Sequence, residues 1–591
     1  MVWVQLIKEV LIMPFSKLKG RKLMLCDMIY QGPTKQSDWH DYIVASYRDL
    51  LTNKKELFYI EDPTINIYVV KPQYRKFKKP RHFMKKKYLD EVNVKYKNVL
   101  REIAKIAGPQ YVEYYESHTT KTERKNLLKY PYVLGADVDI ETYYREIWNR
   151  ECGTEGKKPV TKAYFDIEVD QIHYTGKIAK NGECPINAIS FVDGEGLCVY
   201  EFLLRNPENP LIEKFEKNIQ QFYQDLHSYF DEFYGKLDYK IYMFDSEIEM
   251  LRQYFNLTHS LNRDFIEGWN IFGFDINYII ERIKELGYEP QEFFCNKHFP
   301  QQRYYFREDT RTFEIARKNS YFNVADSSHY VDMMINYAAL RKSQGAVKRV
   351  NLGYIAKKEL KDTKLDYSDA GNIRTLPYND YYKFVLYSIK DSLLLYGIDR
   401  KVHDTENLYL TTDTNCVPYK DAMKQTVVFR ALMYKHLTEL GYALGHNCNF
   451  DTNTNGKYDE NGERIGDEDD DDDTFEGAIN GDPMLNMANG KLLYGVPSMF
   501  LYGITIDFDF SAMYPNSILA FNIFATTMIG KVIVDYTPDI TYDSDMGKEY
   551  VEDIIADDVI HIGHKWHNLS NVETLNEKMK RKLLEKRRGV A

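Results

Sequence analysis

Three things are scarce or missing in this 591-residue sequence. Its seven cysteines include no Cys-x-x-Cys pair, so a disulfide scaffold, a zinc site and an iron–sulfur cluster are disfavoured, and reduced thiols in the cytoplasm fit better. The opening apolar stretch contains Lys8 and Glu9 and is too short to span a bilayer, so we expect no membrane partner. Net positive charge is also missing, because the formal charge is -10. This argues against a purely electrostatic coat for nucleic acid.

Charge is nevertheless concentrated locally. Residues 71–88 (KPQYRKFKKPRHFMKKKY) combine Lys and Arg with aromatic residues and contain no acid. Such a stretch can contact phosphates and stack on bases of DNA or RNA, although an ordinary solvated loop has the same composition. Residues 451–474 are acidic, and we expect a disordered, self-repelling insertion there. Its start resembles a calcium loop, but Gly462 stands where a bidentate Glu is expected.

The middle of the chain has the pattern of an α/β layer domain. KAYFDIEVD, INAISFVD and LCVYEFLL, within 160–204, read as strands separated by turn residues. Residues 275–287 have apolar residues at helical spacing and end at Gly287, and residues 378–402 read as one long helix. Alternating strands and helices predict an α/β domain over about 150–402.

Acidic residues in this region have the spacing of a metal site. On a strand, Asp166 and Glu168 point to the same side, while Phe165, Ile167 and Val169 point into a core. Like charges held together are unfavourable for stability but suit a divalent cation. A similar pair, Asp139 and Glu141, is followed by a helical pattern, so we set it aside.

Two further segments supply acids for the same chemistry. Asp275 stands at the start of a predicted helix, where a carboxylate is favoured, and Tyr387 and Asp391 share one face of the later helix. Three Asp and one Glu can hold two cations, one to activate a water and one to stabilise the leaving oxygen. The alternative is that each acid only caps a helix or faces solvent.

The order of four segments resembles a known family. YFDIEV, GWNIFGFD, YSIKD and then DFDFSAMYP are similar to the motifs of family B DNA polymerases of the bacteriophage replicase type, over most of the chain. The resemblance implies a DNA-replicating enzyme with proofreading activity, located in the host cytoplasm if viral. It implies an α/β and α+β multidomain fold, in this order: an N-terminal mixed β domain (1–150, completed by 403–474), an RNase H-like 3′→5′ exonuclease domain (151–402), a partial palm (475–565) and the start of a fingers helix (566–591).

The first three motifs form the exonuclease site in that family. The resemblance therefore assigns Mg²⁺ to Asp166, Glu168, Asp275 and Asp391, as two ions for which Mn²⁺ can substitute. It gives Tyr387 the role of orienting the water. Asn270 and Phe274 would contact the terminal nucleotides of single-stranded DNA. The sequence departs from the family at Asn277, where relatives usually carry Pro.

The fourth segment resembles the first palm motif of the polymerase site. Alignment on Tyr-Pro selects Asp509 as its metal ligand, and Asp507, on the same side of the strand, stays an alternative. Tyr514 would lie under the deoxyribose of the dNTP. The resemblance also implies contacts from the following residues: the triphosphate with Phe510, Ser511, Ala512, Met513 and Arg587, and primer–template DNA with Gly477 and Ala478.

The later fingers motif, the second palm motif and the thumb have no counterpart in this sequence. One palm carboxylate cannot set up two-metal transfer. We therefore expect the N-terminal subunit of a split polymerase, completed by a second chain. The alternatives are a stand-alone 3′→5′ exonuclease with a vestigial palm and a truncated one-chain polymerase. A binding module without activity would leave all four exonuclease acids without a role.

Overall fold

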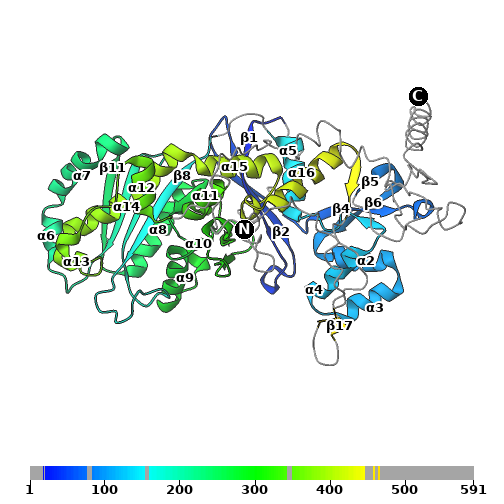
Figure 1. The fold of residues 1–591 in the computed structure, drawn as a ribbon, viewed down its shortest axis with the longest axis horizontal. Coiled ribbons are helices and arrows are strands. Elements are labelled where there is room, and N and C mark those ends of the chain that lie inside the picture. Colours follow the sequence, from blue (N-terminus) through cyan, green and yellow to red (C-terminus); the bar gives the residue numbers. More distant parts are fainter. Residues whose placement is uncertain are drawn as a thin grey trace, which may run out of the picture. The chain divides into compact units, whose positions relative to one another are not determined.

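The computed structural model describes residues 18, 20–75, 83–153, 159–342, 349–445, 457–458 and 464–465. The chain divides into two compact units, residues 1–69 with 85–444 and residues 70–84 with 445–591. Nearly all described helices and strands belong to the first unit (Figure 1). Within the described residues, no helix combines the length and apolar character that crossing a bilayer requires.

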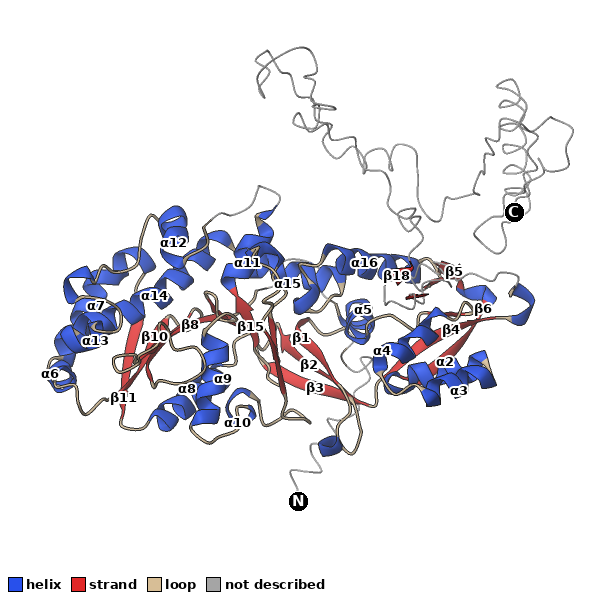
Figure 2. Cartoon of the chain, turned by 60° about the horizontal axis from the view of Figure 1, so that its bottom comes forward, coloured by secondary structure: helices blue, strands red, loops and turns tan. Residues whose placement is uncertain are grey.

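A six-stranded mixed sheet is the largest element of the first unit (Figure 2). Its strand order is β11-β10-β9-β8-β12-β15. β9 is antiparallel to both β8 and β10, whereas β8, β12 and β15 are mutually parallel and β11 is parallel to β10. The strands are β8 (Lys162–Val169), β9 (Ile186–Asp193), β10 (Cys198–Leu204), β11 (Asp238–Phe244), β12 (Phe265–Gly268) and β15 (His329–Asp332). The three strands predicted within 160–204 are therefore confirmed.

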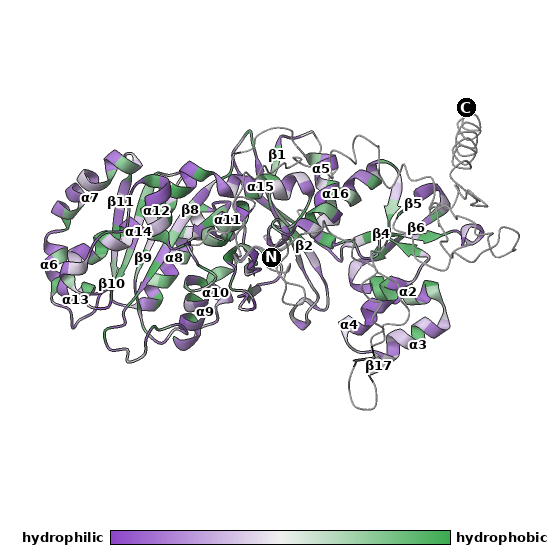
Figure 3. Ribbon diagram, in the orientation of Figure 1, coloured by the Kyte–Doolittle hydropathy of each residue, from purple (hydrophilic) through white to green (hydrophobic). Residues whose placement is uncertain are grey.

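Helices cover both faces of this sheet. Because side chains alternate along β8, Tyr164 packs into the core on one face and Phe165 into the core on the other. In Figure 3 these helices carry both hydrophilic and hydrophobic residues, as expected for helices with one side on a sheet. The helices on the Tyr164 face are α6 (Leu211–Lys217), α7 (Ile219–Tyr234), α11 (Met333–Leu340), α12 (Leu352–Leu360), α13 (Leu376–Asn379) and α14 (Tyr381–Val402). The helices on the Phe165 face are α8 (Glu247–Leu261), α9 (Asp275–Glu285) and α10 (Gln291–Phe294).

The two predicted helices differ in how well the sequence located them. α9 has the predicted start and apolar stripe, and Gly287 follows it with a positive φ of 82°. The helix predicted over 378–402 is wrong at its start. The chain forms α13 up to Asn379, then breaks, and Asp380 caps α14 by accepting the N–H of Lys383. A capping Asp competes with helix continuation, and the apolar pattern conceals it.

The residues before the large sheet form two smaller sheets and several helices around a separate core. Asp139 caps α5 by accepting the N–H groups of Glu141 and Thr142, so the decision to set aside this acidic pair is confirmed. The elements are β1 (Leu23–Gln31), β2 (Tyr42–Asp49), β3 (Lys55–Glu61), β4 (Thr64–Val70), β6 (Leu89–Lys95), β7 (Val133–Leu134), α2 (Val99–Ala107), α3 (Pro109–Ser117), α4 (Lys121–Arg124) and α5 (Ile140–Cys152).

The segment after α14 returns to the first strands. The Tyr419 hydroxyl donates to the carbonyl of Cys26 at 2.7 Å, and the Gly135 N–H donates to Leu444 at 2.8 Å. The elements here are α15 (Asp404–Asn415), η10 (Tyr419–Asp421), α16 (Gln425–Glu439) and β16 (Tyr442–Leu444). Two smaller strand pairs are β13 (Tyr304–Arg307) with β14 (Tyr321–Val324) and, inside the predicted acidic insertion, β17 (Lys457–Tyr458) with β18 (Arg464–Ile465).

Candidate active site

β8 carries the first two acids of the site. Asp166 and Glu168 lie on the same side of the strand as Tyr164, the side that packs under α14. Their cross-strand neighbours on β9 are the small residues Ser190 and Ala188. Small neighbours leave both carboxylates uncovered by bulky side chains from the adjacent strand.

α14 contributes the third acid. One carboxylate oxygen each of Asp166, Glu168 and Asp391 lie within 4.8 Å of one another. Asp391 is buried, and the two strand residues are half-buried. The Ser392 hydroxyl donates to the carbonyl of Ser190 at 3.2 Å, which ties α14 to the sheet beside the acids. Residues more than 220 positions apart in the sequence thus converge as the predicted motif order requires.

Asp275 lies beside this group but outside it. Its Oδ1 accepts the backbone N–H of Ile167, between the two β8 acids, at 3.3 Å. The side chain is buried at the start of α9, where the helix dipole favours a carboxylate. The structure therefore gathers three of the four predicted acids, with Asp275 adjacent and committed to a backbone hydrogen bond.

Mutual repulsion and burial raise the pKa values of these acids. Burial raises the pKa of Asp166 well above its usual range, and the neighbouring carboxylates raise it further. Burial, and then the charge of Asp391, raises the pKa of Glu168 to about 8. Burial raises the pKa of Asp275 to about 7 and also raises the pKa of Asp391. All four groups can be ionised at neutral pH only if cations compensate their charge.

Lys364 is a cation in this site that no sequence motif predicted. Its Nζ lies 2.6 Å from Oδ2 of Asp391 and 3.2 Å from the hydroxyl oxygen of Tyr387. Burial lowers the pKa of Lys364, but the nearby carboxylates outweigh this effect and hold the pKa above its ordinary value. Lys364 follows α12 in the sequence stretch LKDTKLDY, which has no motif spacing, so only the three-dimensional structure identifies it.

Tyr387 lies one helical turn before Asp391. Burial raises its pKa above the ordinary value, and the negative charge of Glu168 adds to the effect. The hydroxyl therefore stays protonated at neutral pH and can both donate and accept hydrogen bonds. Such a group can orient a water molecule beside the carboxylates.

A cleft of about 770 Å³ opens beside the acids, with Asp166 and Lys364 in its lining. Asn270 also lines the cleft, and its backbone has a positive φ of 63°. The other predicted nucleotide contact, Phe274, is half-buried at the start of α9, packs on Tyr278 with ring centres 5.3 Å apart, and is absent from this lining. The rest of the lining is Trp269, Met334, Val350, Asn351, Leu352, Gly353 and Thr363.

The donor set fits a hard divalent cation. Carboxylate oxygens are the ligands that Mg²⁺, Mn²⁺ and Ca²⁺ prefer. Oδ1 of Asp391 is buried and has no hydrogen-bond partner among the described residues, so it is available to such an ion.

The predicted palm and fingers residues lie outside the described residues: Gly477, Ala478, Asp507, Asp509, Phe510, Ser511, Ala512, Met513, Tyr514 and Arg587.

Comparison with known proteins connects this site to a family. The sequence model of the family B DNA polymerase exonuclease domain matches residues 121–335. The DNA-directed DNA polymerase of Escherichia phage RB69 is 28% identical over 276 residues, which cover 45% of this chain and 28% of that polymerase.

Two shorter matches point the same way. Over 49 residues, 8% of this chain, the DNA polymerase catalytic subunit of Murid herpesvirus 1 is 51% identical and the DNA-directed DNA polymerase of Enterobacteria phage T4 is 49% identical. These segments cover 4% and 6% of those proteins. In every one of these matches, the aligned part spans less than a third of the relative's length.

Proposed function

This chain is a member of the family B DNA polymerases through its exonuclease domain, and on that premise we propose that it removes nucleotides from the 3′ ends of single DNA strands. The single observation that carries the proposal is the convergence of three carboxylates within 4.8 Å beside an open cleft. Like charges are costly to hold so close without a cation. Exonuclease domains of this family depend on metal ions, which supplies the reason for the arrangement.

We assign the metal-binding role to Asp166, Glu168 and Asp391, with Asp275 joining them when its side chain turns from the Ile167 N–H. Mg²⁺ is the expected ion, and Mn²⁺ is the expected substitute. When bound, the ions supply electrostatic stabilisation of the charge that develops on the phosphoryl oxygens.

The protein's own groups position the reactants. The Tyr387 hydroxyl, kept protonated by its surroundings, orients a water toward the terminal phosphodiester. Lys364 neutralises part of the carboxylate charge and holds the hydroxyl of Tyr387 in place. Asn270 faces the cleft and contacts the terminal nucleotide. The cleft is open at the surface, so a single strand can enter from its 3′ end.

We also propose that the domain that carries this site has an RNase H-like fold. An RNase H-like domain has a mixed sheet with its acids on the central strand and on a helix that packs against it. The strand order β10-β9-β8-β12-β15, with β9 antiparallel to its neighbours, supports that assignment for residues 151–402. The placement of the acids on β8 and α14 supports it further.

The direct test is degradation of a 5′-labelled single strand in the presence of Mg²⁺. The wild-type chain is expected to produce a ladder that shortens from the 3′ end. Asp391→Asn is expected to reduce the rate by at least about a thousandfold, because it removes a ligand and part of the charge. Glu213→Gln on the exposed side of α6 is the matched control and should degrade at the wild-type rate. Degradation that survives in Asp391→Asn would contradict the proposal.

The polymerase part of the function stays a prediction. A dNTP site at Asp509 and a second chain that completes it concern residues outside the described part of the structure. Relatives named as DNA-directed DNA polymerases support the broader assignment. Extension of a primed template by the purified chain alone would contradict the prediction of a second subunit, whereas extension only after adding such a subunit would support it.

A further inference from the structure

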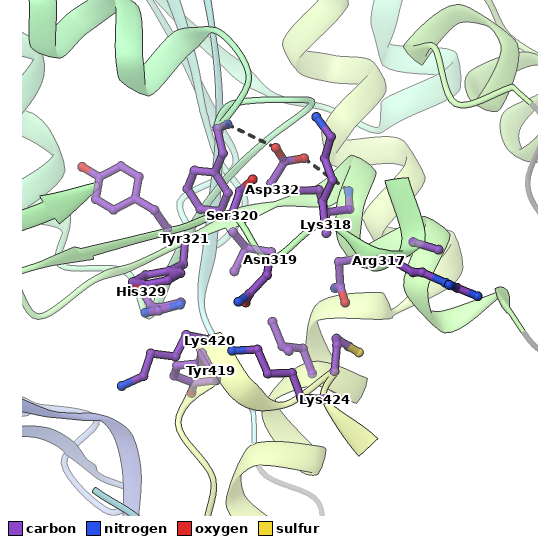
Figure 4. A pocket seen from close by; sticks show the side chains of 18 of the residues that line it. Arg317, Lys318, Asn319, Ser320, Tyr321, His329, Asp332, Tyr419, Lys420 and Lys424 are labelled. Carbon is purple, nitrogen blue, oxygen red and sulfur yellow. Dashed lines mark hydrogen bonds between the residues drawn. The ribbon is translucent and has the colours of Figure 1, made fainter. Parts of the chain in front are cut away.

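A second cavity, separate from the acidic cleft, lies between the end of β15 and the segment that follows α15 (Figure 4). Its volume is about 260 Å³, and it shares no lining residue with the cleft. One wall is formed by residues 316–321, and the opposite wall by Tyr419, Lys420 and Lys424 (Figure 4). β15 and α11 form the floor.

Positive charge dominates this cavity. Its lining includes Arg317, Lys318, Lys342, Lys420 and Lys424. Three of these are paired with acids outside the lining: Arg317 with Glu314, Lys420 with Glu141 and Lys424 with Asp421, at 2.7, 2.6 and 2.6 Å. Within the described part of the chain, no carboxylate lies within 4.0 Å of the Lys318 or Lys342 ammonium group. Two cations therefore remain for an anionic ligand.

The one carboxylate in the lining does not cancel this charge. Asp332 caps α11, and its oxygens accept the N–H groups of Asn270, Phe272, Met334 and Ile335 at 3.1, 3.1, 3.0 and 3.3 Å. Four backbone donors occupy both of its oxygens. The acid is thus part of the scaffold and does not pair with Lys318 or Lys342.

A buried amide in the floor lacks partners. Asn336 is only 5% exposed, and neither its Nδ2 nor its Oδ1 has a hydrogen-bond partner among the described residues. Leaving a buried amide unpaired is costly, so such a group is expected to meet a ligand or ordered water. An amide donates and accepts side by side, which matches the edge of a nucleobase.

Flat aromatic surfaces complete the lining. The rings of His329 and Tyr419 lie 4.4 Å apart, and Tyr321 and Phe272 also line the cavity. Aromatic faces stack on bases of any sequence. The volume is just below the range of about 300–1,000 Å³ usual for small-ligand sites, so it has room for one nucleotide unit and not for a folded strand.

From the free lysines, the unpaired amide and the aromatic walls together, we propose that this cavity binds a nucleoside 5′-monophosphate unit. Lys318 and Lys342 contact the phosphate, Asn336 contacts the base edge, and Tyr419 with His329 forms the stacking surface. The unit can be a free mononucleotide or one nucleotide of a single strand. The inference does not depend on hydrolysis at the acidic cleft.

Calorimetric titration with deoxyadenosine 5′-monophosphate in EDTA tests the site on the full chain. Lys318→Ala combined with Lys342→Ala is expected to weaken binding at least about tenfold, and Asn336→Leu by a similar factor. Asn336→Leu should keep or raise the melting temperature, because it removes an unpaired buried amide. Lys214→Ala, an exposed lysine on α6, and Asp391→Asn, in the acidic group beside the cleft, should bind as the wild type does.

Titrations with other ligands distinguish a free mononucleotide from one nucleotide of a DNA strand. Inorganic phosphate and deoxyadenosine should each bind at least about tenfold more weakly than the nucleotide. A short oligodeoxynucleotide that binds more tightly, and loses this advantage in the lysine double variant, would assign the unit to a DNA strand. Wild-type affinity in the lysine double variant, equal binding of phosphate and nucleotide, or no heat of binding at about 1 mM nucleotide would overturn the proposal.

Discussion

The ammonium group of Lys364 lies 2.6 Å from Oδ2 of Asp391, one of the three converging carboxylates. This ion pair supplies one positive charge to a group of acids whose proposed function requires several positive charges. Lys364→Met should therefore lower the rate of single-strand degradation by about 10- to 100-fold. The substitution removes the hydrogen bond to the Tyr387 hydroxyl and leaves more of the negative charge of the carboxylates uncompensated.

The measurement for Lys364 is the single-turnover rate as a function of Mg²⁺ concentration. The variant should need less Mg²⁺ to reach half its maximal rate, because Lys364 no longer places a competing positive charge beside Asp391. Lys214→Met on the exposed side of α6 is the control. An unchanged rate and an unchanged Mg²⁺ requirement would show that Lys364 is only structural.

Removing charge from β8 should separate activity from stability. Asp166→Asn combined with Glu168→Gln should abolish degradation and, without metal, raise the free energy of unfolding by about 1–3 kcal/mol, because it relieves repulsion between buried acids. Urea unfolding in EDTA provides the stability, and the labelled strand provides the activity. A variant that is both inactive and less stable than the wild type would argue for a purely structural role of these acids.

A buried ion pair links the N-terminal sheet to the large sheet. Oδ1 of Asp264 lies 2.7 Å from Nη2 of Arg48 and 3.2 Å from Nζ of Lys55, and its Oδ2 accepts two hydrogen bonds from Thr161. Asp264→Asn should lower the free energy of unfolding by about 3 kcal/mol, since it leaves two buried cations unbalanced. Asp245→Asn, at an exposed pair with Arg205, should change it by less than about 1 kcal/mol.

The same carboxylate predicts a pH dependence of stability. Burial raises the pKa of Asp264, but Lys55 and Arg48 outweigh it and lower the pKa to about 2. Because the folded pKa lies below the unfolded one, the contribution is complete above about pH 4 and is lost as the pH falls toward 2. The stability difference between wild type and Asp264→Asn should therefore shrink by on the order of 2 kcal/mol over this range. A difference that stays constant between pH 6 and pH 3 would contradict this account.

Asn270 allows backbone and side-chain roles to be separated. Its φ of 63° suits Gly and Asn but not a β-branched residue. Asn270→Gly should keep the stability within about 1 kcal/mol, whereas Asn270→Val should cost about 1–3 kcal/mol. Both should raise KM for the single strand several-fold, because both remove the amide from the cleft. A normal KM in the stable Asn270→Gly variant would remove Asn270 from the substrate contacts.

Regular periodicity explains what the sequence could predict. Alternation along a strand placed Asp166 and Glu168 on one side, and the four-residue spacing placed Tyr387 and Asp391 on one helix face. Both follow from local geometry. The motif order then indicated that these local groups meet, which the structure shows for three acids.

The other features of the fold and the site depend on contacts between residues that are far apart in the sequence. Lys364 enters the site from a segment without regular spacing, and the direction of the Asp275 carboxylate depends on its hydrogen bond from the backbone N–H of Ile167. The start of α14 depends on a cap at Asp380, which interrupts an otherwise continuous apolar pattern. The basic cavity is assembled from segments between 272 and 424, so no local pattern could reveal it.

The central claim is that the acids of β8 and α14 hold catalytic cations. The most direct measurement is an anomalous difference map from crystals grown with Mn²⁺ and a short single strand, using a catalytically slowed Tyr387→Phe variant. The account predicts anomalous density between Asp166, Glu168 and Asp391, with the 3′ end of the strand in the adjoining cleft. Manganese bound only elsewhere, with the three carboxylates free of density at saturating metal, would contradict it.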